Sequence, residues 1–456
     1  MLYDIVIVGG GPGGYASALY AHNFGLSVAL VEKDRPGGTC LIRGCIPAKQ
    51  WLHVADVFRT VANAAEFGVV AEQPSLDWPA ALARKNQTVE ALVRGLAGLL
   101  KKKGVEIITG VGKLAGPGKV EVAAGGETKI LEGGAVILAT GSYARTIPGY
   151  EIDGKRIVTS DHALDWEQRP GSVAIVGGGV IGCEFASFLV DVGSEVHVFE
   201  VMDQILPGSD SEAARHLQRE LQKRGVKFHI GVAVEPPVVG QSVKVPFGDE
   251  SVEVDVVLLS VGRGPNTAGV GLETTSAVVD REFVKVDLAT MQTDQPGLYA
   301  VGDLVAGTAQ LAHVGFAEGI SAVTHIATGQ AQPVNYQAIP RVTYTHPEVA
   351  EVGLSEAGAL EQGLDVAAAK HVFNGIGRAI IIGDNQGFAK VVSVKEGPIV
   401  GATVVGPQAG ELIHELMFAV GWEALPQEAA AFIHAHPTLS EAIGETLMSA
   451  AGRSLH

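Results

Sequence analysis

Two stretches of the chain repeat one order of hydrophobic and polar positions. Each begins with a short, nearly continuous apolar run, passes through a glycine-rich turn into a helix-like segment, and closes with a second apolar run that ends in glutamate. Such runs are typical of buried parallel strands, so the sequence predicts two βαβ units. The first unit covers residues 4–8, 9–14, a helix to about residue 24, and 27–31; the second covers 172–176, 177–182, a helix to about residue 192, and 195–199.

Both glycine turns match the pattern G-x-G-x-x-G, and the acids Glu32 and Glu200 each lie 23 residues after the first glycine. In such units the glycines allow close approach of a pyrophosphate, the helix N-terminus stabilises its charge, and the acid accepts hydrogen bonds from a ribose. We therefore expect two dinucleotide sites, with glycine turns that bind nothing as the alternative. The expected contacts are Gly9, Gly11 and Gly14 in the first site and Gly177, Gly179, Val180, Ile181 and Gly182 in the second.

Residues 201–204, after Glu200, contain no arginine that could neutralise a 2′-phosphate. The second site is therefore predicted to take NAD rather than NADP.

The remaining apolar runs complete an α/β pattern and then change character. Further strands are predicted over 135–139, 254–260 and 297–301, with a turn at 261–265. After about residue 337, short strands near 370–373, 388–394 and 399–405 precede helices near 409–420, 426–433 and 438–450. This order predicts a separate C-terminal α+β domain behind two Rossmann-like nucleotide-binding domains.

Composition narrows the classes of function. The 456 residues carry a net charge of −17, which argues against nucleic acid and anionic membrane surfaces as partners. No apolar run approaches the roughly 18 residues that span a bilayer. The first strand begins at once, which leaves no room for a signal peptide. Three cysteines in so long a chain suit a reducing compartment. We expect the cytoplasm, or an organelle matrix if a transit peptide was removed.

Two of the three cysteines, Cys40 and Cys45, lie just after the first glycine turn. In an α-helix, residues five apart rise by about 7.5 Å, beyond easy disulfide reach, so an irregular loop is expected to bring them together. Pro47 is acceptable in a first helical turn, which places Cys45 near a helix N-terminus, where a thiolate is favoured. A structural disulfide or two buried thiols are the alternatives. Cys183, inside the second predicted helix, is expected to be a small core residue.

The segment from Gly37 to Lys49 resembles the redox-active disulfide motif of the pyridine nucleotide–disulfide oxidoreductases. The resemblance continues over nearly the whole chain, through residues 139–142, 299–303, 311–313, 344–350 and 434–441. It implies FAD in the first nucleotide domain and NAD in the second, and no metal site. The implied domains are 1–149 and 273–337 for FAD, 150–272 for NAD, and 338–456 for dimerisation.

Within the family, the closing motif and the NAD-type acid most resemble the members that oxidise dihydrolipoyl groups. Those members reduce NAD and serve 2-oxo-acid dehydrogenase complexes or the glycine cleavage system. The resemblance therefore implies a homodimer whose protein partner is a lipoyl-bearing acyltransferase (E2) or the glycine-cleavage carrier protein.

The resemblance also assigns roles to single residues. Cys40 is expected to exchange with the substrate and Cys45 to pass electrons to the flavin, with Lys49 and Glu184 paired beside it. His436, supported by Glu441 and contributed by the second subunit, is expected to act as acid–base. Further FAD contacts are expected from Glu32, Lys33, Gly38, Thr39, Lys49, Gly112, Thr140, Gly141, Asp303, Ala312 and His313, and further NAD contacts from Glu200 and Gly262.

Some of these residues have simpler explanations. Glu184 could merely complement a helix dipole, although burial would favour a partner such as Lys49. Residues 438–441 read as a capping box that opens the last helix, which competes with a histidine-supporting role for Glu441. His436 precedes Pro437 and could simply shape a loop.

The chain departs from the family pattern at a few positions. Ile42 and Arg43 stand where Asn-Val is frequent, Ala48 replaces a common serine, and Gly264 replaces a frequent arginine. We expect Arg43 to raise the thiolate fraction of the reduced pair, with a solvated loop arginine as the alternative.

Two other functions compete with dihydrolipoyl oxidation. One is an NAD(P)H-dependent reductase of another disulfide or of a metal ion. The C-terminus lacks the cysteine pair of a mercuric reductase, and Glu200 opposes the NADP preference of a glutathione-type reductase. The other is a non-catalytic FAD/NAD-binding scaffold or redox sensor, which the retained cysteines, Lys49, His436 and Glu441 oppose.

Overall fold

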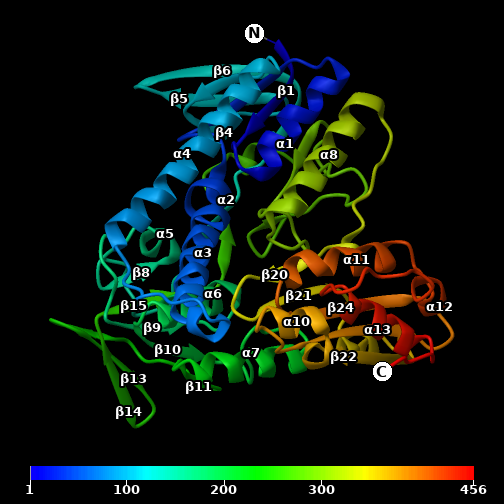
Figure 1. Cartoon of the computed structure of the whole chain (residues 1–456). Coiled ribbons are helices and arrows are strands. Elements are labelled where there is room, and N and C mark those ends of the chain that lie inside the picture. The colour runs from blue at the N-terminus through cyan, green and yellow to red at the C-terminus, as the bar shows by residue number, and fades with distance from the viewer. Residues whose placement is uncertain (1) are drawn as a thin grey trace.

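The computed structural model describes residues 2–456, and its first part is built on a seven-stranded sheet (Figure 1). The strands run in the order β3-β2-β1-β6-β5-β4, and β19 also pairs with β6. They are β1 (Leu2–Val8), β2 (Val28–Glu32), β3 (Glu106–Thr109), β4 (Val111–Leu114), β5 (Lys119–Ala124), β6 (Glu127–Leu138) and β19 (Leu298–Ala300). β1 is parallel to both β2 and β6, whereas β4, β5 and β6 are antiparallel. Helices α1 (Pro12–Ala21) and α8 (Ala312–Thr328) pack against each other beside this sheet.

The second part is a five-stranded parallel sheet of order β11-β10-β9-β15-β8. It consists of β8 (Ile157–Thr159), β9 (Ser172–Val176), β10 (Glu195–Glu200), β11 (Lys227–Ile230) and β15 (Val256–Leu259). The helices are α5 (Ser160–Ala163), α6 (Val180–Asp191) and α7 (Ser211–Lys223). A small antiparallel sheet, β12 (Val238–Val239), β13 (Val243–Phe247) and β14 (Glu250–Val254), projects from it in Figure 1.

The chain passes between the two nucleotide-binding parts along one short antiparallel strand pair. β7 (Ser142–Ala144) leads out of the first part, and β16 (Arg263–Pro265) returns to it. A further pair, β17 (Val279–Asp280) and β18 (Phe283–Val284), follows on the way to β19.

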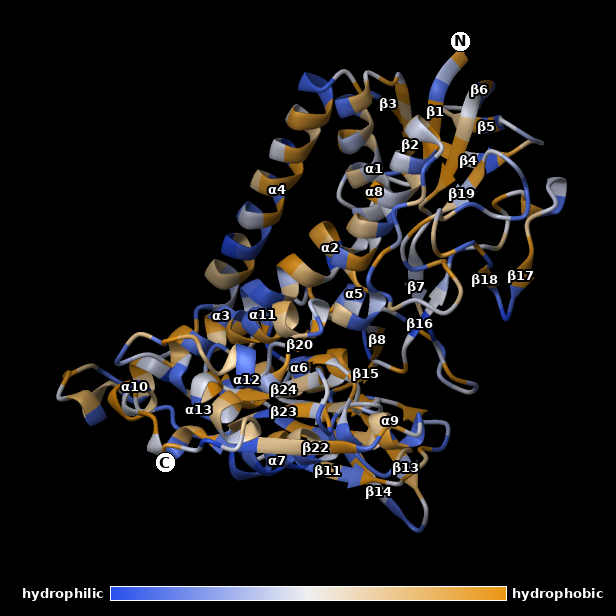
Figure 2. Cartoon of the chain, turned by 90° about the vertical axis from the view of Figure 1, so that its right-hand side faces the viewer, coloured by the Kyte–Doolittle hydropathy of each residue, from blue (hydrophilic) through white to orange (hydrophobic). Residues whose placement is uncertain are grey.

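Three helices carry the cysteine segment and brace it against the second part. They are α2 (Gly38–Arg43), α3 (Cys45–Ala62) and α4 (Trp78–Lys102). α3 packs on both α4 and α6, and the rings of Trp51, Trp78 and Phe188 stack at this junction with centroids 4.5–5.8 Å apart. Along α4, hydrophilic and hydrophobic residues alternate (Figure 2). The cysteines therefore sit at the end of a helix that is packed on both sides.

The C-terminal part is an antiparallel sheet of order β20-β21-β24-β23-β22. Its strands are β20 (Arg341–Thr343), β21 (Glu348–Gly353), β22 (Val366–Val372), β23 (Phe388–Val394) and β24 (Ile399–Gly406). Its helices are α9 (Glu356–Glu361), α10 (Gly377–Ile381), α11 (Ala409–Gly421), α12 (Pro426–Ala429) and α13 (Glu441–Ala450). α11 and α13 pack on this sheet, and their buried residues join those of the strands in one core.

The predicted fold class is confirmed, and several elements differ in detail. The expected strand over 254–260 is two strands, β14 and β15, separated at Asp255. The expected helix over 426–433 ends at Ala429, and the last helix begins at Glu441 rather than at residue 438. No helix within residues 2–456 is both long enough and apolar enough to cross a bilayer.

Candidate active site

One cavity of about 1830 Å³ lies where the three parts meet, and both glycine turns open into it. The predicted site residues that line it are Gly9, Gly11, Glu32, Lys33, Gly38, Thr39, Cys40, Cys45, Lys49, Gly112, Thr140, Gly141, Gly177, Gly179, Val180, Ile181, Glu184, Glu200, Gly262, Asp303, Ala312 and His313. Four predicted residues do not line it: Gly14, Gly182, His436 and Glu441.

Gly14 and Gly182 do not line the cavity because they pack against the glycine turns instead. A Cβ on Gly14 would lie 1.8 Å from the carbonyl oxygen of Gly9, and one on Gly182 would lie 2.0 Å from that of Gly177. Gly9 and Gly177 themselves have φ angles of +107° and +106°, which favour glycine. The two turns therefore have the same construction, each helix packing directly on the turn before it.

The acids that close the two units hold the turns in the same way. Glu32 accepts a hydrogen bond from the backbone N–H of Gly10, and Glu200 accepts one from Gly178, both at 2.7 Å. The helices that follow, α1 and α6, have Gly11 and Gly179 as their N-cap residues and therefore no side-chain cap. Uncapped helix N-termini that face a cavity offer free N–H donors to phosphate, so both turns fit a dinucleotide.

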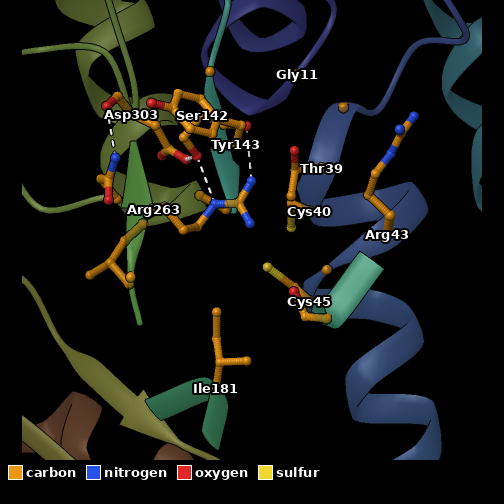
Figure 3. A pocket seen from close by; sticks show the side chains of 18 of the residues that line it. Gly11, Thr39, Cys40, Arg43, Cys45, Ser142, Tyr143, Ile181, Arg263 and Asp303 are labelled. Atoms are coloured by element: carbon orange, nitrogen blue, oxygen red, sulfur yellow. Dashed lines mark hydrogen bonds between the residues drawn. The ribbon is translucent and has the colours of Figure 1, made fainter. Parts of the chain in front are cut away.

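Asp303 offers a free acceptor to the same cavity. One carboxylate oxygen accepts a hydrogen bond from the Ser142 hydroxyl, and the other has no partner within residues 2–456 (Figure 3). A carboxylate with one free oxygen can accept hydrogen bonds from the hydroxyl groups of a ribityl chain. The residues present therefore fit FAD in the first part of the cavity.

Cys40 and Cys45 meet at a break between two helices. Cys40 lies within α2, Gly44 breaks the helical path with φ −146° and ψ −110°, and Cys45 is the first residue of α3. The expectation of an irregular loop is thus wrong for Cys40, because residues 38–43 are helical and only Gly44 departs. The expected position of Cys45 at a helix N-terminus is confirmed. Both cysteines are free thiols here, on the cavity side of their helices (Figure 3).

The two thiols have opposite acidities. The pKa of Cys45 is lowered to about 7, first because of the neighbouring Cys40 thiol and then because the Lys49 cation lies nearby. The same neighbouring thiol, together with burial, raises the pKa of Cys40. Cys45 therefore carries the thiolate of the reduced pair, and Cys40 keeps its proton.

Lys49 and Glu184 form the expected ion pair. The ammonium lies 2.8 Å from both carboxylate oxygens, although the two residues are 135 positions apart. Glu184 is buried and also accepts a hydrogen bond of 3.0 Å from the backbone N–H of Tyr344, whose ring lies 4.7 Å from the ammonium. Residues from all three parts of the chain thus fix one cation beside Cys45.

Arg43 does not take the place that the sequence suggested. Its guanidinium binds the carboxylate of Asp34 at 2.7 Å, and its side chain is directed away from the two sulfur atoms (Figure 3). It is absent from the groups that lower the pKa of Cys45. The structure therefore does not support the expectation that Arg43 raises the thiolate fraction. It favours the alternative of a solvated arginine, although Arg43 is the last residue of α2 rather than part of a loop.

His436 and Glu441 are paired but lie outside the cavity of their own chain. The ring nitrogen Nδ1 of His436 is 2.8 Å from Glu441 Oε1, and Glu441 Oε2 accepts a hydrogen bond of 2.9 Å from the backbone N–H of Thr438. One carboxylate therefore both holds the turn before α13, at Thr438, and supports the histidine. The expected capping box is not formed, because the N-cap residue of α13 is Ser440, without a side-chain cap. The His436 side chain is 77% exposed, and α13 lies far from α2 in Figure 1.

Sequence reasoning assigned no role to three of the residues that shape this site. Tyr344 acts through its backbone N–H, which no sequence pattern reveals. Ser142 follows directly after the Thr140-Gly141 pair, and Arg263 follows Gly262, so their positions beside expected contacts were the available signal.

Comparison with known proteins identifies the class. The model of the pyridine nucleotide-disulphide oxidoreductases matches residues 3–319, and the model of that family's dimerisation domain matches residues 339–447. The chain belongs to this family, whose cofactors are FAD and NAD.

Several of its relatives over the full length are dihydrolipoyl dehydrogenases. The chain is 40% identical to a dihydrolipoyl dehydrogenase of Bacillus subtilis, with 100% of this chain and 99% of the relative covered. It is 38% identical to that of Chlamydia muridarum, with 100% and 98% covered. Among solved structures, LpdA from Mycobacterium tuberculosis superposes with a TM-score of 0.91 at 29% identity, covering 98% of this chain and 99% of that one.

Proposed function

We propose that the chain is a dihydrolipoyl dehydrogenase, which oxidises protein-bound dihydrolipoamide to lipoamide and reduces NAD⁺ to NADH. The observation that carries the proposal is the pair Cys40 and Cys45, with one acidic thiol, in a cavity shared by two dinucleotide turns. Full-length similarity to dihydrolipoyl dehydrogenases supports it.

The proposed chemistry begins at the oxidised cysteine pair. His436 Nε2 takes a proton from a substrate thiol, because its Nδ1 faces Glu441. The resulting thiolate attacks Cys40 Sγ, the Cys40–Cys45 bond breaks, and Cys45 leaves as the stable thiolate. The second substrate thiol then displaces Cys40, which regains a proton. The substrate loses two electrons and two protons, and the cysteines gain the two electrons.

When bound, FAD would supply a two-electron acceptor for the cysteine pair, and NAD⁺ would supply the final hydride acceptor. The proposed holders of FAD are the first glycine turn, Glu32 and Asp303. Those of NAD are the second glycine turn, Glu200 and Gly262. The Lys49–Glu184 pair keeps a cation beside Cys45 throughout. The domains proposed for these tasks are 1–149 with 273–337 for FAD, 150–272 for NAD and 338–456 for the subunit interface.

The histidine is proposed to come from a second subunit. His436 is exposed and lies outside the cavity of its own chain, and the chain has the family's dimerisation domain. A homodimer would place two such histidines at two cysteine pairs. The lipoyl group itself is proposed to arrive on an acyltransferase or on the glycine-cleavage carrier protein. The proposed compartment is the cytoplasm, or an organelle matrix if a transit peptide was removed.

The test is turnover by the purified holoenzyme. We expect dihydrolipoamide-dependent NADH formation, faster with NAD⁺ than with NADP⁺, and its loss in Cys40→Ser and Cys45→Ser. The matched control is Cys183→Ser, because that thiol is buried in α6 and is absent from the residues lining the cavity. Rapid NADH-dependent reduction of another disulfide without turnover of lipoamide would contradict the proposal.

A further inference from the structure

Arg263 and Ser142 form a chain of hydrogen bonds that ends on Asp303. Arg263 donates from Nε to the Ser142 hydroxyl oxygen at 2.7 Å and from Nη2 to the Ser142 carbonyl oxygen at 2.9 Å. Because that hydroxyl oxygen accepts from arginine, its single hydrogen is free to be donated to Asp303, as observed (Figure 3). The direction of each hydrogen bond from Arg263 through Ser142 to Asp303 is therefore fixed.

The members of this chain belong to different parts of the molecule. Ser142 is the first residue of β7 and is buried, Arg263 is the first residue of β16, and Asp303 follows β19. The two strands pair in the order Arg263 with Ala144 and Pro265 with Ser142. The arginine that reaches Asp303 through serine is thus carried by the segment that returns from the second nucleotide part, directly after Gly262.

The backbone around Asp303 is held from other directions as well. Gln310 donates a hydrogen bond of 3.1 Å to the Asp303 carbonyl oxygen, and Gly302 donates its N–H to the carboxylate of Glu318. Among the hydrogen bonds within residues 2–456, only the one from Ser142 acts on the Asp303 side chain itself. The orientation of the free carboxylate oxygen therefore depends on Ser142, and Ser142 depends on the two donors of Arg263.

We propose that Arg263, acting through Ser142, is a positioning residue that orients the Asp303 carboxylate for the ribityl hydroxyls of FAD. The assignment rests on the proposed place of FAD beside Asp303. An arginine suits this task because its planar fork reaches the hydroxyl and the carbonyl of one serine together, which a lysine ammonium cannot do in the same geometry. Loss of a hydrogen bond to a charged group reduces affinity by about tenfold or more.

The experiment measures the dissociation of FAD from the full-length holoenzyme by the fluorescence of released flavin. We expect Ser142→Ala and Arg263→Gln each to weaken FAD binding by about tenfold, and Arg263→Lys to resemble Arg263→Gln. Ser142→Thr keeps the hydroxyl and is expected to restore binding. The double variant is expected to be no weaker than either single one, because both act along one chain.

Arg145→Gln is the matched control. Arg145 lies beside the same strand pair, binds Glu282 at 2.7 Å and donates a hydrogen bond of 3.3 Å to the backbone carbonyl oxygen of Arg263, but within residues 2–456 its side chain makes no hydrogen bond to Ser142 or Asp303. We expect it to leave FAD affinity unchanged. Additive losses in the double variant, an equal loss in Arg145→Gln, or a rise in the KM for NADH with unchanged FAD affinity would each overturn the proposal.

If Arg263→Gln does not fold, the difference between Ser142→Ala and Ser142→Thr decides. Equal FAD affinity in these two variants would overturn the proposal. Turnover of dihydrolipoamide by the unchanged protein is measured separately. The proposed function can therefore fail while the proposed role of Arg263 is upheld. Equally, the role of Arg263 can fail while the proposed function is upheld.

Discussion

At the scale of single residues, the acidity of Cys45 decides how the reduced pair behaves. The thiol stands at the first position of α3, beside the Cys40 thiol and near Lys49, and its pKa falls to about 7. Near neutral pH a large fraction of it is therefore thiolate. A thiol with this acidity is also a good leaving group in disulfide exchange.

Replacing Lys49 by methionine tests this account. Since the lysine cation stabilises the thiolate, we expect Lys49→Met to move the thiol titration midpoint upward by about one pH unit. The measurement is the pH dependence of thiolate ultraviolet absorbance in the reduced protein. Pairing Lys49→Met with Glu184→Gln avoids leaving a buried, unpaired carboxylate, which would destabilise the fold.

Arg43→Val is the control for Lys49→Met. Its guanidinium is bound to Asp34, so its loss is expected to leave the midpoint in place. A midpoint that moves with Arg43 and stays fixed with Lys49 would reverse our assignment of the cation that acts on Cys45.

At the scale of elements, the two βαβ units show one construction used twice. In each unit, the first glycine adopts a positive φ and the last lets the helix pack directly on the turn. The glutamate at the end of the second strand accepts a hydrogen bond from a backbone N–H of the turn. The middle glycine differs: a Cβ on Gly179 would meet nothing within 4 Å, and this residue lines the cavity. Within the second turn, Gly182 thus serves packing, whereas Gly179 is available for binding.

Two alanine substitutions separate these roles. Gly182→Ala is expected to destabilise the protein by roughly 1–3 kcal/mol, because the new methyl group would overlap the Gly177 carbonyl oxygen. Gly179→Ala is expected to leave thermal unfolding unchanged and to weaken NAD binding by tenfold or more, because its methyl group projects into the cavity. Calorimetric unfolding and NADH titration distinguish them, and a loss of stability in Gly179→Ala would contradict this division.

Sequence patterns predicted the elements whose apolar residues are continuous or are followed by a glycine turn. β9 and β23 begin and end where predicted, since each is an apolar run buried in a sheet. The long helix α4 was not predicted, because its five buried residues, Trp78, Lys85, Val89, Val93 and Leu100, are spread over 25 positions among charged neighbours.

The same limit applies to the site. The Lys49–Glu184 pair could be anticipated because a buried charge needs a partner and because of the family resemblance. The contact of Glu184 with the Tyr344 backbone and the Ser142–Arg263 contact depend on how distant segments pack, and no local pattern encodes that.

At the scale of the whole molecule, one chain holds the reactive parts in two separate places. The cysteines and the dinucleotide turns face the cavity, while the exposed His436 and its half-buried carboxylate partner Glu441 lie at the start of α13. In a twofold dimer, each cysteine pair would need the histidine of the other chain. Dimer formation and catalysis are then inseparable.

Mixed dimers test this arrangement. A heterodimer of one Cys40→Ser chain and one His436→Gln chain, isolated through two different tags, contains one complete site of two. We expect it to recover about half of the unchanged activity, whereas each homodimeric variant falls by 10²-fold or more. The measurement is dihydrolipoamide-dependent NADH formation. A heterodimer as inactive as its parents would show that histidine and cysteines act within one chain.

The strand pair β7–β16 has a consequence for protein engineering. Because the outgoing and returning segments are hydrogen-bonded neighbours, residues 145–262 leave and re-enter the first part at a single point. Topologically they form an insertion, and a short turn could join its two ends if they were excised. The first part would then keep its sheet, since β19 pairs with β6 without help from the inserted segment. This single crossing point permits one nucleotide module to be exchanged for another, provided that the new module packs on α3 as α6 does and supplies a partner for Lys49.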